Sequence, residues 1–331
     1  MSTAPETSPQ GPVEEPPKAA PKTSPAEPLL RRLWIYQAER FPLARTIPLL
    51  AVFSAASVNV SALLAGRPLP GAGAYLTAAA LSLGIFFQMR AFDEAKDAED
   101  DRRFRPERPI PRGLVSLRLI IRLAGATGAA MLALAAAWTP GTLLLLLLAW
   151  SWLGLMTAEF FAPSWLKARP LAYLLSHMAI MPLIDLMLTG VEWTAAPGSG
   201  HVPAMALWLF LGLSFVNGTV LEIGRKTWAP ENERPGVETY SKLWGPARAA
   251  LIWLAVVGLG LVLLLTLGLA LGAFWPIALV GVTGFALAAR AALGFRRAPS
   301  PAAQTRLDTL SGLWVLACYG AAGFLPLVFG G

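Results

Sequence analysis

The sequence is poor in cysteine and in charged residues, and both shortages narrow the fold classes open to it. Its single cysteine, Cys318, excludes a disulfide framework, and we interpret it as a small buried apolar residue. Charged residues make up 14% of the 331 residues and hydrophobic residues 55%, which is too apolar for an ordinary soluble domain. Segments of strictly alternating hydrophobicity are also missing, which argues against a membrane-spanning β-barrel.

Long apolar runs dominate the chain instead. Crossing a hydrocarbon core of ~30 Å takes roughly 20 helical residues. Nine segments are long enough, at approximately 45–66, 72–92, 115–137, 141–160, 170–190, 203–224, 247–271, 274–294 and 308–328. We therefore predict an all-α, polytopic membrane protein with nine transmembrane helices in one domain, residues 31–331. Residues 1–30 are rich in Pro, Ala, Ser and Glu and contain no apolar run, so we expect a disordered cytoplasmic tail rather than a signal peptide.

The net charge of +7 follows membrane topology rather than a nucleic-acid site. If the N-terminus is cytoplasmic, 26 of the 27 Lys and Arg residues lie on the cytoplasmic side, and only Arg67 lies outside. This asymmetry predicts an N-in, C-out, multi-pass protein of the cytoplasmic (inner) membrane, with membrane lipid and no nucleic acid as a partner. Arginines on the inner side can also hold the phosphates of lipids or substrates.

The second apolar segment ends in a dense acidic cluster, followed by a burst of arginines. The acids are Asp93, Glu94, Asp97, Glu99, Asp100 and Asp101, and the arginines are Arg102, Arg103, Arg105, Arg108 and Arg112. On a helix, Asp93, Asp97 and Asp101 share one face, where they oppose the helix dipole and repel one another. Such a cluster favours a bound cation, and Mg²⁺ is suited because it bridges a few carboxylates to phosphate oxygens. The alternative is a solvated acidic turn that pairs with the arginines.

A second charged segment follows the sixth apolar segment, at residues 221–240. It holds Glu222, Arg225, Lys226, Glu231 and Glu233. Since the two segments both follow even-numbered helices, they lie on the same side, and we predict that they meet at one cytoplasmic mouth. The alternative is a surface loop whose glutamates pair with Arg234 and Lys242.

Two polar residues lie inside the fifth apolar segment, namely His177 and Asp185. An ionisable residue within a membrane helix suggests a functional site. Asp185 is placed near the outer end, where it can reach water, so a structural role for the pair stays equally open.

The first charged segment resembles the first signature of the UbiA superfamily of intramembrane prenyltransferases. That signature reads Asn-Asp-x-x-Asp-x-x-x-Asp followed by Arg-Pro-x-x-x-Gly, and the matching positions are Asp93, Glu94, Asp97, Asp101, Arg108, Pro109 and Gly113. Asp replaces the leading Asn and Glu replaces the next Asp. The family's second aspartate-rich motif is matched only in altered form and without an Asp, by Glu222, Arg225, Lys226, Glu231, Glu233, Gly236 and Thr239. The resemblance covers roughly residues 30–330.

The resemblance implies transfer of a prenyl group from a polyprenyl diphosphate to an aromatic or other lipophilic acceptor, with Mg²⁺ as cofactor and diphosphate as product. It implies metal ligands at Asp93, Glu94, Asp97, Asp101, Glu222, Glu231 and Glu233. It implies diphosphate binding by Arg108, Lys167, Arg225 and Lys226, and catalytic roles for Asp97, Asp101, Arg225 and Lys226. The competing interpretations are a membrane transporter, a catalytically silent UbiA-like protein and a CDP-alcohol phosphotransferase, whose Asp-Gly-x-x-Ala-Arg signature the sequence lacks.

Overall fold

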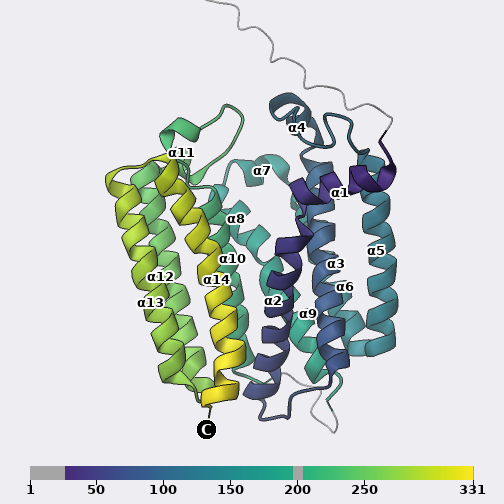
Figure 1. Ribbon diagram of the computed structural model, residues 1–331, viewed down its shortest axis with the longest axis vertical. Helices are drawn as coiled ribbons and strands as arrows, with labels where there is room; N and C mark the ends of the chain where they lie inside the picture. Colours follow the sequence, from purple (N-terminus) through teal and green to yellow (C-terminus); the bar gives the residue numbers. More distant parts are fainter. Residues whose placement is uncertain (1–26, 197–203, 331) are drawn as a thin grey trace, which may run out of the picture.

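The computed structural model describes residues 27–196 and 204–330, and over these residues it contains helices and no strands (Figure 1). Nine spans within the described residues are long and apolar enough to cross a membrane. They are α2 (Leu43–Leu64), α3 (Ala72–Lys96), α5 (Leu117–Trp138), α6 (Pro140–Thr157), the pair α8 (Pro170–Met178) and α9 (Ile180–Trp193), α10 (Leu207–Arg225), α12 (Pro246–Ala270), α13 (Phe274–Arg297) and α14 (Pro301–Phe329). The predicted fold class is confirmed, whereas the prediction of a disordered tail falls mostly on residues 1–26, outside the described part.

The short helices gather at one end of the bundle, which we call the charged end. They are α1 (Leu29–Arg40), α4 (Ala98–Phe104), α7 (Pro163–Lys167) and α11 (Tyr240–Trp244), joined by the 3₁₀ turns η1 (Glu159–Phe161) and η2 (Pro230–Asn232). The C-terminus lies at the opposite end (Figure 1). The sequence did not predict α1, which lies across α3 and α5 and buries Tyr36 against Ala91 of α3 and Ile120 of α5.

Local sequence signals explain where most helices begin. Proline occupies the first turn of α6, α7, α8, α12 and α14, where its missing N–H costs no helical hydrogen bond. The side chains of Ser116, Thr139 and Ser300 cap α5, α6 and α14 by accepting backbone N–H groups. The fifth span was predicted as one helix, but it is divided at Ala179, because Pro182 has no N–H to bond the carbonyl four residues before it.

Helix α2 is central to the packing and contacts α3, α9 and α14. Its approach to α14 is very close, since a Cβ placed on Gly323 would lie 2.5 Å from the Cα of Ala56. Asn59 Nδ2 also donates to the Gly323 carbonyl at 3.0 Å. In Figure 1 the two helices approach near the C-terminus and diverge toward the charged end.

An ion pair joins α2 to α9 at the end of the bundle opposite the charged end. Arg67, just after α2, binds both oxygens of Glu192 on α9 at 2.7 Å each. Ser61 adds a third donor at 2.7 Å, so the buried carboxylate is fully compensated. Arg67, the single basic residue that the charge pattern left outside, therefore has a structural partner.

Candidate active site

The first acidic segment does not form one continuous helix. Helix α3 ends at Lys96, Asp97 occupies the junction with φ −88° and ψ 6°, and α4 begins at Ala98. The backbone still bonds Asp97 N to the carbonyl of Asp93 at 2.9 Å and Asp101 N to the carbonyl of Asp97 at 2.8 Å. The helical repeat of four residues is therefore kept locally. The carboxylates of Asp93, Asp97 and Asp101 nevertheless have different surroundings.

Asp101 is neutralised by two arginines of the following loop. Its side chain is buried and lies 3.1 Å from Nη1 of Arg105, while Nη1 of Arg108 reaches its two oxygens at 2.7 and 2.6 Å. Gly113 ends this loop with φ +81°, a conformation that favours glycine. The predicted metal ligand Asp101 and the predicted diphosphate ligand Arg108 are thus engaged with each other.

Glu94 is also engaged, with a residue that the sequence did not single out. Its carboxylate is 2% exposed and accepts from Nε of Arg40, at the end of α1, at 2.5 Å. Burying a carboxylate requires such a partner. Glu94 therefore fastens α1 to α3, which differs from the metal-binding role that the resemblance implied.

Of the four predicted metal ligands in this segment, Asp93 and Asp97 are the two that remain open to a ligand. Asp93 is exposed and lies 3.9 Å from Arg90, which is too far for a hydrogen bond. Asp97 is half-buried and makes no ion pair within the described residues. Burial, and next the negative charge of Asp101, raise the pKa of the Asp97 carboxyl above its ordinary value.

The second charged segment is arranged around Glu222 near the end of α10. This glutamate binds Arg225 at 2.5 Å and Lys226 at 2.8 Å. The other two predicted ligands lie elsewhere: Glu231 is exposed on η2, and Glu233 accepts hydrogen bonds from Thr239 and from Ser241 of α11. Lys167, at the end of α7, is exposed.

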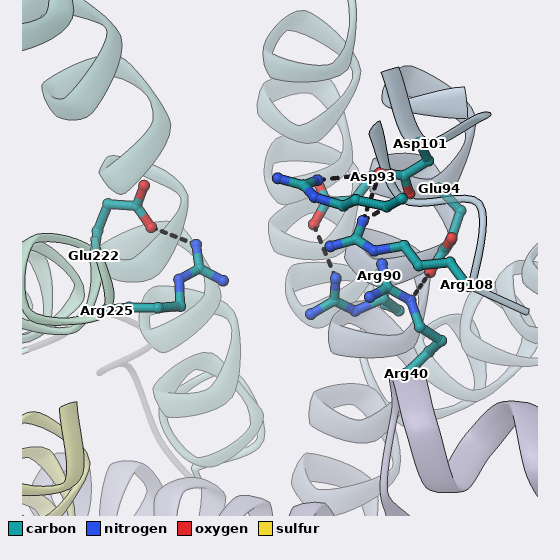
Figure 2. A network of polar contacts seen from close by, with 9 residues as sticks. Arg40, Arg90, Asp93, Glu94, Asp101, Arg108, Glu222 and Arg225 are labelled. Carbon is teal, nitrogen blue, oxygen red and sulfur yellow. Dashed lines mark hydrogen bonds and ion pairs between the residues drawn. The ribbon is translucent and has the colours of Figure 1, made fainter. Parts of the chain in front are cut away.

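The two charged segments meet at the charged end, as the sequence predicted. A Cβ on Gly236, which has φ +73°, would lie 2.8 Å from the ring of Phe104 on α4, so the two loops are in contact. The charges of Arg225 and Asp93 attract each other across the space between α10 and α3. Figure 2 shows Glu222 and Arg225 on one side, facing the labelled residues of the first segment on the other.

The predicted set of seven metal ligands is not assembled. Among the residues that the structure describes, no three His, Cys, Asp or Glu side chains are grouped closely enough to hold a metal ion. Two open carboxylates, Asp93 and Asp97, nevertheless suit Mg²⁺, which typically takes one or two carboxylates and fills its other positions with water and substrate phosphates.

A third polar group, which sequence reasoning missed, joins α3 to η1 and α8. Nζ of Lys96 donates to Oη of Tyr173 at 2.7 Å and lies 2.9 Å from Oε1 of Glu159. Glu159 begins η1, whose three residues have φ values of 48°, 52° and 56°, an uncommon left-handed conformation outside glycine. The charge of Lys96 amid the acids was a visible signal, but nothing in the sequence indicated its partners.

His177 and Asp185 have separate surroundings. His177 stacks on the ring of Tyr173, and Nδ1 of His177 donates to the backbone carbonyl of Tyr173 at 2.9 Å. Asp185 is fully buried and accepts from Ser57 at 2.7 Å and Tyr319 at 2.5 Å. The expectation that Asp185 reaches water is wrong, because these neutral donors from α2 and α14 enclose it.

Comparisons with known proteins identify similar sequences and structures. The profile of the UbiA prenyltransferase family matches residues 49–316. The apo structure of a UbiA homolog from Aeropyrum pernix K1 is similar with a TM-score of 0.62 and 19% identity, covering 81% of this chain and 96% of that chain. A structure of digeranylgeranylglyceryl phosphate synthase in membranes is similar with a TM-score of 0.59 and 15% identity, covering 88% of this chain and 98% of that chain. A comparison with curated proteins gives no match.

Proposed function

We propose that this chain, which belongs to the UbiA prenyltransferase family, transfers a prenyl group from a polyprenyl diphosphate to a lipophilic acceptor within the membrane. The observation that carries the proposal is the meeting of two charged segments at one end of a bundle of apolar helices. A molecule with a charged head and a long hydrocarbon tail matches that division between polar end and apolar interior.

Arg225 and Lys226 are the residues best placed to bind the diphosphate. Both are fixed by Glu222, yet the Arg225 side chain is 60% exposed and that of Lys226 35% exposed, so each retains free donors. Charge-assisted hydrogen bonds to phosphate oxygens are strong. Glu222 acts here as a positioning residue for two cations rather than as a metal ligand.

Asp93 and Asp97 would hold Mg²⁺ together with the diphosphate. When bound, this ion neutralises the charge that develops on the departing diphosphate. Asp101, Arg105 and Arg108 keep the loop after α4 in place. The apolar side chains of the bundle keep water from the allylic carbon as the prenyl group leaves.

The acceptor class follows from the same division of the bundle into a charged end and an apolar interior. An acceptor must dissolve in the membrane, so quinone precursors, other aromatic compounds and lipid alcohols all qualify. Since one structural neighbour is a digeranylgeranylglyceryl phosphate synthase, glycerol-based lipids belong among the candidates.

The orientation proposed is N-in, with the charged end in the cytoplasm. The short helices and the basic loops lie at one end of the bundle (Figure 1), and basic residues near membrane spans favour the cytoplasmic side. The charged end would then receive soluble Mg²⁺ and release diphosphate into the cytoplasm, at the inner membrane.

The test is turnover of labelled polyprenyl diphosphate by the purified full-length protein in lipid nanodiscs, with a panel of acceptors. Released diphosphate and prenylated product are measured together. We expect Mg²⁺-dependent turnover that Asp97→Asn abolishes, and unchanged turnover in Asp100→Asn, whose side chain is exposed. No turnover with any acceptor would support the catalytically silent alternative, and equal activity in the two variants would overturn the role of Asp97.

A further inference from the structure

A second charged feature lies away from the candidate active site, where the end of α13 meets the start of α14. It is a groove of about 960 Å³. Three arginines line it, Arg290 and Arg297 on α13 and Arg306 on α14. Arg290 and Arg297 are two helical turns apart, so they point from the same side of α13. None of the acidic residues of the two charged segments lines this groove.

The three arginines carry uncompensated charge. All three are exposed, and within the described residues none lies at ion-pair distance from a carboxylate. The arginines of the candidate active site, in contrast, are paired with Asp101, Glu94 and Glu222. Placing three like charges around one groove is unfavourable unless an anion joins them.

The start of α14 adds a second favourable interaction for an anion. Helix α14 has 29 residues and begins beside the groove, with Ser300 as its cap. The N-terminus of a long helix carries partial positive charge and attracts anions. Thr309 also lines the groove, and its hydroxyl can donate a hydrogen bond, whereas the Thr305 hydroxyl donates to the Pro301 carbonyl at 3.0 Å.

The remaining wall of the groove is apolar. Leu287 and Leu293 of α13 and Leu310 of α14 line it, and the leucines of α13 are exposed. The junction of α13 and α14 lies at the charged end of two candidate membrane spans (Figure 1), so we expect the groove there to lie near the depth of the phospholipid headgroups.

We propose that this groove is a binding site for an anionic phospholipid. The lipid phosphate lies among Arg290, Arg297 and Arg306, and one acyl chain follows the leucines along α13. A free phosphate would use the arginines but not the apolar wall, and a zwitterionic lipid would bring its own cation toward the three arginines. Both features together select a lipid with net negative charge.

The test measures lipid binding by the purified full-length protein in detergent, using native mass spectrometry with phosphatidylglycerol and phosphatidylcholine. The groove variant carries Arg290→Gln, Arg297→Gln and Arg306→Gln. The matched control carries Arg118→Gln, Arg122→Gln and Arg248→Gln, which removes the same charge from exposed arginines near the charged end of α5 and α12. Since all six side chains are exposed, both variants are expected to fold.

We expect phosphatidylglycerol to bind the native protein more tightly than phosphatidylcholine does. Each groove arginine removed should weaken that binding about fivefold, and the control should match the native protein. The single variant Arg306→Gln should show one such step. Equal losses in the two triple variants would mean general electrostatic attraction and overturn the site. Competition by millimolar inorganic phosphate as effective as that by phosphatidylglycerol would assign the groove to free phosphate instead.

Discussion

Replacing Asp101 by asparagine should destabilise the protein, although the residue belongs to an acidic motif associated with metal binding. Asparagine keeps the size of the side chain but removes the charge and one acceptor. The Asp101 side chain is 3% exposed, and its partners Arg105 and Arg108 are 26% and 23% exposed. The variant would leave both guanidinium groups partly buried beside a neutral amide.

The size of the effect follows from these exposures. Breaking a fully buried ion pair costs about 3–5 kcal/mol. Because water reaches both arginines, we expect a smaller loss, about 2–3 kcal/mol of the free energy of unfolding. For a chain of this size, that corresponds to a fall in Tm of about 3–4 °C.

The assay is thermal unfolding in nanodiscs, followed by tryptophan fluorescence, beside the prenyl-transfer assay on the same samples. Asp97→Asn is the informative comparison, because Asp97 makes no ion pair in the described part of the chain and should lose activity with little change in Tm. Asp100→Asn is the matched control, with neither effect expected. If Asp101→Asn lost activity with an unchanged Tm, Asp101 would be a ligand rather than an anchor for the loop.

Three further predictions concern pH, the opposite end of the bundle and topology. The raised pKa of Asp97 means that its proton persists to higher pH than on an ordinary Asp, so the Mg²⁺ concentration for half-maximal activity should rise as pH falls; a requirement independent of pH would contradict the assignment. Arg67→Gln leaves the buried Glu192 without its cation and should cost about 3 kcal/mol of unfolding free energy, while the activity of the folded fraction stays unchanged. Labelling of single cysteines from the cytoplasmic side should modify positions in 105–113 and 227–239 but not at 330, and the reverse pattern would invert the proposed orientation.

The features that sequence predicted well depend on properties that act over whole segments. Apolar length sets which segments can span a membrane, and the structure has candidate spans in the same nine places. The distribution of Lys and Arg along the sequence predicted that both charged segments lie at one end of the bundle. These signals are read along the chain and do not require knowledge of which helices are neighbours.

The partners of individual side chains could not be predicted in the same way. Glu94 pairs with Arg40, 54 residues earlier, and Lys96 reaches Tyr173, 77 residues later. Such pairs depend on how the helices pack, and local spacing instead suggested a shared face of carboxylates. The left-handed turn at η1 was equally hidden, because neither Phe160 nor Phe161 favours that conformation.

The close approach of α2 and α14 limits how a long hydrocarbon tail can pass between the bilayer and the interior of the bundle. At Gly323 and Ala56 the two backbones lie too close for even a methyl group to be added, so no isoprenoid or acyl chain fits between them there. The axes of the two helices separate toward the charged end (Figure 1), so this close contact lies in the part of the seam nearer the C-terminus. A prenyl chain held inside the bundle is therefore blocked at this contact from leaving between α2 and α14 toward the leaflet opposite the charged end.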